Sequence, residues 1–474
     1  MSDLLTQPAV DLLALLEAKK ISVLELAELH IQRIEQLNPL LNAVVDFDPE
    51  EIRRQAMALD CTTAPRGPLH GLPLTVKSSI SVAGRLCETG SLFNKGRRPT
   101  SDAEAVKRLR KAGALILGTT NCPEFLMAYE TDNRLYGRTS NPWDLTCTAG
   151  GSSGGESAAI AAGLSAGGLG SDGGGSVREP AHFTGICAMK PTPGRIPTAG
   201  HLPANVGPFS LLGTVGPMAR TMADVTLLFR VLAGALDIDP VAAPVCYRAS
   251  APEALKNIRI GYFEDDGLVP VTAETRQAVQ DAIHSLRRHG FHVEAFRPPS
   301  LDRARELWYT FFIHCGALLL EPLGRGRESD FSPTFLDFLS IAHMHVPLAA
   351  NELLGAWCET DVVRSKLLAE MRDFPILLSP VCSIPAFRHG ERNWTLHDAN
   401  GAARTLDYLD AMRFTQWFNL LGAPAAVVPI SRSAEGLPIG LQLAGRPYGD
   451  EDVLTIATIL EQDFGYIAPP VLHP

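Results

Sequence analysis

GGSSGGES at 150–157 and GSDGGGSVREP at 170–180 are the two glycine-rich stretches on which the interpretation of this sequence turns. Glycine permits backbone conformations with positive φ and lets N–H groups approach a ligand closely. Ser176 follows three consecutive glycines, so several N–H groups near it can point at one oxygen atom, as an oxyanion hole requires. The alanine-rich run at 156–162 predicts a helix between the two turns, which argues against a flexible linker.

Glycine-rich loops also bind phosphates or simply allow tight packing. A phosphate-binding loop of the GxxxxGK[ST] type is not matched, because no lysine follows these glycines. The dinucleotide fingerprint GxGxxG is matched only partially, by Gly168-Leu169-Gly170. Spacing alone therefore leaves catalysis and tight packing both open.

Lys77 stands in GLPLTVKSS at 71–79, directly after the apolar run 72–76. The run predicts a strand that enters the interior. Burial of a lysine lowers its pKa because it disfavours the charged form, and a neutral lysine can serve as a general base. The alternative is that Lys77 merely ends a strand at the surface.

Outward from these motifs, strands alternate with helices, which predicts an α/β fold built on a sheet. Residues 8–60 are expected to form two helices, one with Ser22 as N-cap and Glu25 completing a capping box. Further helices are predicted at 102–112, 156–162, 222–236, 272–289 and 455–462, with a mostly helical segment at 300–375. Strands are predicted at 72–76, 114–117, 258–263, 291–296, 376–378 and 425–430. No convincing linker divides the chain, so residues 1–474 are expected to form a single domain.

The composition limits the classes of function. The 474 residues are 46% hydrophobic and 20% charged, and the net charge of -10 argues against a nucleic-acid partner. The nine cysteines are scattered without metal-ligand spacing, which favours free thiols in a reducing, cytoplasmic compartment and no bound metal. The start of the chain lacks a secretory signal pattern, and no run of 18 apolar residues suggests a membrane span.

Together these motifs resemble the amidase signature family. The match continues through KPTPGRIP at 190–197, GPMAR at 216–220, FNLLGAPAAVVP at 418–429 and GLPIGLQLAGRP at 436–447, in the order of the family. The resemblance implies a large mixed central β-sheet covered by helices on both faces, with the core signature region at about 70–220. It also implies hydrolysis of amide bonds without a cofactor.

The resemblance further implies a Ser-cisSer-Lys triad and an acyl-enzyme. Ser176 matches the nucleophile, Ser152 the bridging serine with a cis peptide bond, and Lys77 the base. Oxyanion donors map to the backbone of Gly173, Gly174, Gly175 and Ser176. Asp172 and Arg178 are interpreted as supports of the loop, for example as an ion pair, and Ser153 and Ser79 as further hydrogen-bond donors.

The branch of the family is indicated by departures from its patterns. The tRNA-dependent amidotransferases typically have an amide-recognising aspartate in their A subunit where this chain has Gly213, which argues against glutamine as substrate. GGSSGGE at 150–156 is more similar to the fatty-acid-amide and aryl-acylamide branch. Gly173 stands where the family commonly has threonine or isoleucine, and Glu179 where an apolar residue is frequent. Glu179 is expected either to help recognition or to pair with Arg178.

The expected substrate is a small-molecule amide, carbamate (urethane) or ester with a bulky apolar group, bound by a monomer or homodimer. The alternative is the A subunit of a glutamine-dependent tRNA amidotransferase. Two segments are candidates for the substrate pocket. One contains Leu126, Met127 and Tyr129. The other lies in the helical substrate-pocket segment at about 300–375, where Trp308, Phe312 and Cys315 are spaced to share one helix face. The alternative is that the aromatic residues of this segment only pack the helix onto the core.

Overall fold

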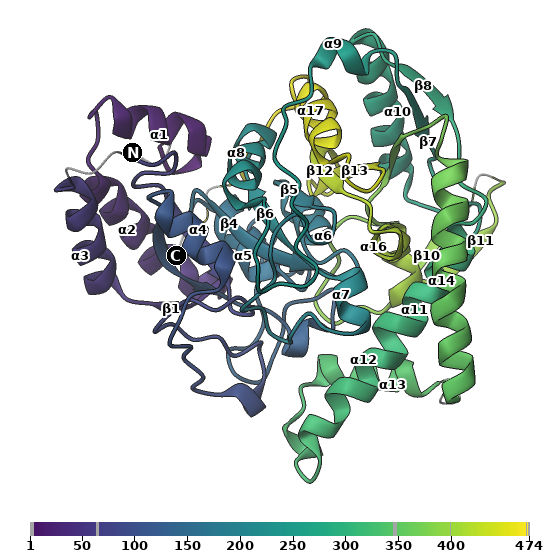
Figure 1. The fold of residues 1–474 in the computed structure, drawn as a ribbon, viewed down its shortest axis with the longest axis horizontal. Helices are drawn as coiled ribbons and strands as arrows, with labels where there is room; N and C mark the ends of the chain where they lie inside the picture. Colours follow the sequence, from purple (N-terminus) through teal and green to yellow (C-terminus); the bar gives the residue numbers. More distant parts are fainter. Residues whose placement is uncertain (1–3, 63–65, 345–347, 399, 471, 473–474) are drawn as a thin grey trace.

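A mixed β-sheet forms the centre of the protein in the computed structural model, which describes residues 4–62, 66–344, 348–398, 400–470 and 472 (Figure 1). The described residues form an 11-stranded sheet in the order β1-β3-β2-β4-β6-β5-β12-β13-β9-β7-β8, and β10 pairs with β11 separately. The strands are β1 Val44–Phe47, β2 Pro73–Lys77, β3 Leu115–Thr120, β4 Gly167–Asp172, β5 Cys187–Lys190, β6 Thr214–Ala219, β7 Arg259–Tyr262, β8 His292–Ala295, β9 Ile376–Pro380, β10 Asn393–His397, β11 Ala403–Asp407, β12 Ala425–Arg432 and β13 Pro438–Gly445.

Helices surround this sheet. They are α1 Ala9–Glu17, α2 Val23–Leu41, α3 Pro49–Asp60, α4 Glu104–Lys111, α5 Gly154–Ala161, α6 Arg178–Thr184, α7 Pro208–Leu212, α8 Met222–Leu232, α9 Pro252–Leu255, α10 Ala273–Arg288, α11 Leu301–Tyr309, α12 Cys315–Leu320, α13 Pro333–His343, α14 Ala350–Glu370, α15 Tyr408–Ala411, α16 Gln416–Leu421 and α17 Asp450–Glu461. No helix in the described part of the chain is long and apolar enough to cross a membrane.

Both faces of the sheet are covered, as predicted. Successive side chains of a strand point to opposite faces. Along β9, Ile376 and Leu378 belong to the apolar core that contains side chains of α8, α10 and α17. Leu377 belongs instead to the core that contains side chains of α11 and α16. The second core thus lies on the opposite face, and it is the one that adjoins the candidate site.

The pairing of β2 with β4 positions the two halves of that site. These strands are parallel neighbours, so their carboxyl ends lie at the same edge of the sheet. Lys77 is the last residue of β2 and Asp172 is the last residue of β4. Parallel pairing therefore brings together two sequence motifs that are far apart along the chain.

Several boundaries differ from the sequence predictions. The capping box of Ser22 and Glu25 at the start of α2 is confirmed, but the prediction of two helices over 8–60 is wrong, because β1 and α3 follow α2. Asn42 ends α2 in a left-handed conformation, and Asp48 with Pro49 begins a new helix.

Strand β4 was not predicted, because glycine-rich sequences lack the bulky side chains typical of strands. Tight packing explains its composition. A Cβ atom on Gly168 would lie 2.0 Å from Oε1 of Glu156 and 2.3 Å from the carbonyl oxygen of Thr75. This strand is therefore glycine-rich because a helix and a neighbouring strand press against it.

The glycine at the start of α5 gives a test of this tight packing. A Cβ atom on Gly155 would lie 2.5 Å from the backbone nitrogen of Asn121 and 2.7 Å from the carbonyl oxygen of Ala43. Gly155→Ala is expected to lower the free energy of unfolding by about 3 kcal/mol, because these backbone atoms cannot move aside locally. Gly355→Ala is the matched control, since Gly355 is helical and exposed with open space around it, and it should raise stability by up to about 1 kcal/mol. Urea unfolding midpoints compare the variants, and equal midpoints would contradict this account.

Candidate active site

Lys77 is buried within a shell of serine hydroxyl groups. Its side chain is fully inaccessible to solvent. The Nζ atom lies 2.6 Å from Oγ of Ser152, 3.0 Å from Oγ of Ser153 and 3.2 Å from Oγ of Ser171. The alternative of a lysine that ends its strand at the surface is therefore wrong.

The surroundings of Lys77 favour its neutral form. Burial lowers the pKa of its ammonium group to about 7, although the nearby Cys122, Asp172 and Glu156 partly oppose this shift. Near neutral pH a large fraction of Lys77 therefore carries a lone pair. An amine in this state can accept a proton from a hydroxyl group at hydrogen-bond distance.

Glu156 is an acidic group near Lys77 that was not singled out in the sequence. It is fully buried in α5, and its two carboxyl oxygens accept hydrogen bonds from Oγ1 of Thr75 at 2.6 Å and Oγ1 of Thr120 at 2.7 Å. Burial raises its pKa to about 8. At this pKa the carboxyl group carries only part of its negative charge near neutral pH, so Glu156 opposes the lowered pKa of Lys77 only partly.

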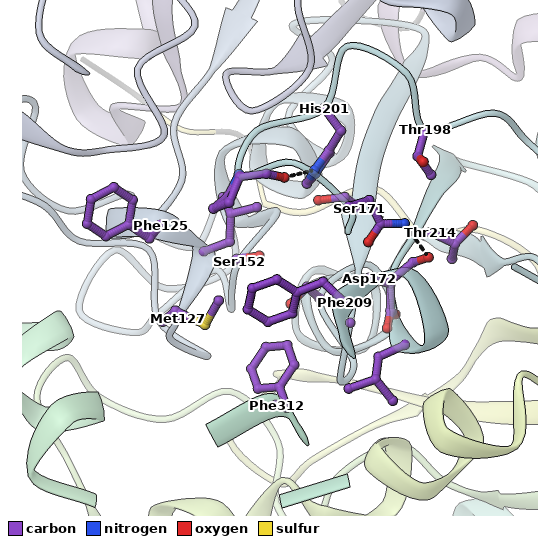
Figure 2. A pocket seen from close by; sticks show the side chains of 17 residues that line it. Phe125, Met127, Ser152, Ser171, Asp172, Thr198, His201, Phe209, Thr214 and Phe312 are labelled. Carbon is purple, nitrogen blue, oxygen red and sulfur yellow. Dashed lines mark hydrogen bonds between the residues drawn. The ribbon is translucent and has the colours of Figure 1, made fainter. Parts of the chain in front are cut away.

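The two serines of the predicted triad face one cavity. The Gly151–Ser152 peptide bond is cis. Ser152, labelled in Figure 2, lines this cavity together with Ser176, and both serines are almost completely buried. The N–H of Ser153 donates to the carbonyl oxygen of Ser176 at 3.1 Å, which ties the two glycine-rich turns together.

Asp172 organises the loop that precedes Ser176. Its carboxylate accepts hydrogen bonds from the N–H groups of Gly175 at 2.8 Å and Val177 at 3.2 Å. It also forms a fully buried ion pair with Arg178 at 3.0 Å. Burial by itself would raise the pKa of Asp172, but the charge and hydrogen bonds of Arg178 outweigh it and hold that pKa well below its usual range.

This arrangement leaves three of the four predicted oxyanion donors unoccupied. The N–H of Gly175 is occupied by Asp172, so it does not fit the predicted role. The N–H groups of Gly173, Gly174 and Ser176 donate to no acceptor in the described part of the chain. They are the backbone donors that remain for a ligand oxygen near Ser176.

Two cavities meet at Ser176. The residues that line both are Leu126, Met127, Ser176 and Phe312. Their shared residues place Ser176 at the junction, so a bound molecule can extend to either side of it.

The predicted pocket residues are brought together, with one exception. Tyr129 and Trp308 line the second cavity, but Cys315 lines neither of the two. Residues Thr310–His314 form a π-helical turn, and such a turn changes the spacing that a regular helix would give. The expectation that 308, 312 and 315 share one face assumed a regular helix, and Cys315 is buried in the core instead.

Further residues of the first cavity were not identified from the sequence. They come from the connection after β5, from α7 and from the start of β6, and they are Thr198, His201, Asn205, Phe209 and Thr214. The Nδ1 atom of His201 lies 2.9 Å from the carbonyl oxygen of Pro203. Since a carbonyl cannot donate, Nδ1 carries the hydrogen atom and Nε2 is an acceptor.

Ser79 and Glu179 lie beside the site, and the predicted pairing of Glu179 with Arg178 is not formed among the described residues. Oγ of Ser79 lies 3.4 Å from Nε2 of His201. Glu179 is fully buried and lies beside the thiol of Cys382. Burial raises the pKa of Glu179 well above its ordinary value. No group of three or more His, Cys, Asp or Glu side chains in the described ranges could hold a metal ion.

Comparison with known proteins shows the family of this chain. The Amidase family model matches residues 25–454. Indoleacetamide hydrolase of Bradyrhizobium diazoefficiens is 34% identical over 471 residues, which cover 97% of this chain and 87% of the relative. The glutamyl-tRNA(Gln) amidotransferase of Roseiflexus castenholzii has an A subunit that is 32% identical over 470 residues, which cover 92% of this chain and 91% of the relative.

A solved structure shows the same fold. The structure of 6-aminohexanoate cyclic dimer hydrolase complexed with substrate aligns with a TM-score of 0.83 and 29% identity, over 97% of each chain. Sequence family, relatives and fold agree over nearly the whole chain. The protein therefore belongs to the amidase signature family and is a hydrolase that acts on carbon–nitrogen bonds.

Proposed function

We propose that this protein is a stand-alone serine amidase that hydrolyses amides with a bulky, largely apolar group through an acyl-enzyme on Ser176. The observation that carries the proposal is the contact of 2.6 Å between the buried Nζ of Lys77 and Oγ of Ser152, in a cavity that Ser152 shares with Ser176. It combines a base whose pKa is close to neutral with a hydroxyl group that can relay protons.

Acylation begins with a proton relay. Neutral Lys77 accepts the hydroxyl proton of Ser152, while Ser152 accepts the hydroxyl proton of Ser176. Oγ of Ser176 attacks the carbonyl carbon, and the N–H groups of Gly173, Gly174 and Ser176 stabilise the oxygen that becomes negative. Ser152 then donates a proton to the leaving nitrogen as the C–N bond breaks, and Lys77 returns its proton to Ser152.

Deacylation repeats these steps with water. The same relay removes a proton from a water molecule, whose oxygen attacks the ester carbon. The C–O bond to Ser176 breaks, and its oxygen regains a proton from Ser152. The products are the free amine and the carboxylic acid, and the enzyme returns to its starting state. Esters and carbamates contain the same acyl carbon and can follow the same route.

A role as the A subunit of an amidotransferase is the second candidate, since relatives of that class match the chain. The residues around Ser176 favour the first candidate. Apolar side chains from Phe125, Met127, Phe209 and Phe312 line the first cavity, and Gly213 offers no carboxylate to a substrate amide. Such a cavity suits an aryl or long-chain group better than the polar side chain of glutamine.

The role of Ser176 is tested by Ser176→Ala. The variant should lose at least about 10⁴-fold in kcat because the acyl-enzyme cannot form. A phosphonylating probe should label the wild type on the peptide that contains Ser176 and leave the variant unlabelled, as shown by mass spectrometry. Ser433→Ala, in the turn between β12 and β13, is the control and should retain activity and labelling. Labelling of Ser176→Ala at another serine with activity kept would refute the assignment.

The base is tested by the pH dependence of kcat/KM. Because burial lowers the pKa of Lys77 to about 7, the proton-accepting form dominates above that pH and is lost below it. For a neutral substrate, kcat/KM should therefore fall about tenfold per pH unit below 7. The variant Lys77→Arg should be inactive, since arginine stays protonated and cannot accept the proton of Ser152. A flat profile from about pH 5 to 9, with folding confirmed by circular dichroism, would count against a lysine base.

Substrate preference is tested with a panel of indole-3-acetamide, an anilide, an aryl carbamate, acetamide and glutamine. The aryl compounds should exceed acetamide by about 100-fold in kcat/KM, because only they bury an apolar group in the cavities. Phe312→Leu removes a ring that lines both cavities and should lower kcat/KM of the aryl compounds about tenfold, mainly through KM, while acetamide changes less than about twofold. A preference for glutamine or acetamide would refute the apolar-substrate proposal.

A further inference from the structure

The carbonyl oxygens of the oxyanion loop are held by side chains from distant parts of the chain. Nε1–H of Trp308 donates to the carbonyl oxygen of Gly173 at 2.8 Å. The carbonyl oxygen of Gly174 accepts from Oγ1 of Thr415 at 2.6 Å and from the hydroxyl of Tyr129 at 3.1 Å. Gly174 thus has two anchors, whereas the carbonyl of Gly173 has Trp308 as its one donor among the described residues.

A hydrogen bond that fixes a backbone carbonyl also fixes the direction of the N–H group of the next residue. The peptide unit is planar, and in the trans form its C=O and N–H point in opposite directions. The bond from Trp308 to the carbonyl of Gly173 therefore sets the direction of the N–H of Gly174. That N–H is one of the donors with no partner in the described structure. Consecutive glycines have little conformational preference of their own, so an outside anchor is needed to fix this plane.

The packing of the aromatic pair explains the glycine at 173. The rings of Trp308 and Phe312 stack with centroids 4.9 Å apart and 13° between their planes. A Cβ atom on Gly173 would lie 2.8 Å from Cε2 of Phe312, and one on Gly174 would lie 2.5 Å from Cζ2 of Trp308. The two rings thus occupy the space where side chains of the loop would stand. The aromatic pair can therefore pack in this way only because residue 173 has no side chain.

We infer that Trp308 is a positioning residue for catalysis: its indole N–H, by holding the carbonyl of Gly173, aligns the N–H of Gly174 with the oxyanion. Trp308 itself is 1% exposed and lines the second cavity. A residue in the substrate-pocket segment thereby supports transition-state stabilisation as well as forming a wall. The inference rests on the proposed acyl-enzyme on Ser176.

The most specific test removes the indole N–H of Trp308 and keeps the shape of its side chain. In β-(3-benzothienyl)alanine a sulfur atom stands in place of the indole N–H, and Trp308→Phe is the simpler genetic variant. Both changes should lower kcat about 10- to 100-fold, somewhat less than removal of an oxyanion donor, because the N–H of Gly174 remains but is less well aligned. For the benzothienyl variant, which keeps the wall of the second cavity, the loss should be equal for acetamide and for an anilide, since both form the same oxyanion, and KM should change little.

Boronic acids give an independent readout. An arylboronic acid forms a tetrahedral adduct with a catalytic serine and places an oxygen in the oxyanion hole, so its inhibition constant should rise by the same factor as kcat falls. The inhibition constant of the carboxylate product should not change. Ser433→Ala, in the turn between β12 and β13, is the control and should leave both inhibition constants unchanged. Thr415→Val should cost less than the loss of the Trp308 N–H, because Tyr129 still holds the carbonyl of Gly174.

Two outcomes would overturn the inference. A loss confined to bulky substrates would make Trp308 a pocket wall only, and an unchanged kcat for the benzothienyl variant would show that its N–H does not align the loop. Failure of the proposed function has a different signature, because wild-type Ser176 would then remain unlabelled by the phosphonylating probe. Labelled, active wild-type enzyme with unaffected Trp308 variants would refute this inference alone.

Discussion

The buried ion pair between Asp172 and Arg178 is the interaction on which the rest of the site depends. Asp172 ends β4 and accepts hydrogen bonds from the loop that follows it, while Arg178 also donates to the carbonyl oxygen of Thr415 and to the side chains of Asn419 and Gln442. A buried charge pair is tolerated only when all its hydrogen-bonding capacity is used. The loop, α6, α16 and β13 must therefore be in place together before Ser176 can be presented.

Burial acts differently on the other ionisable groups near this pair. Lys77 and Glu156 have no counter-ion at salt-bridge distance in the described structure, so burial shifts the pKa of each toward the neutral form, to about 7 and about 8. Asp172, with a guanidinium beside it, remains ionised. The same buried region thus keeps Asp172 charged and favours the neutral form of Lys77. A proton relay through serine hydroxyl groups requires this difference.

The aromatic segment that follows β8 joins substrate binding to the loop. Core packing and pocket lining were alternatives for Trp308 and Phe312, but the structure shows that Trp308 belongs to the core and to the cavity wall at once. The π-helical turn Thr310–His314 follows Trp308 and contains Phe312, and it moves Cys315 out of line with these two rings. Changes in this segment are therefore expected to affect both the shape of the cavity and the order of the glycine loop.

The sequence by itself determined the family and the α/β class, and it predicted Lys77, Ser152 and Ser176 as site residues through the resemblance, because the glycine-rich turns and the lysine after an apolar run match the family motifs in order. Only the tertiary structure decided which groups meet. It paired β2 with the unpredicted β4, occupied the N–H of Gly175 with Asp172, and placed His201 and Phe209 in the cavity. The reason is physical: glycine strands and proline-rich connections carry no periodic signal, and hydrogen bonds between residues distant in the sequence form only when the sheet and its helices pack.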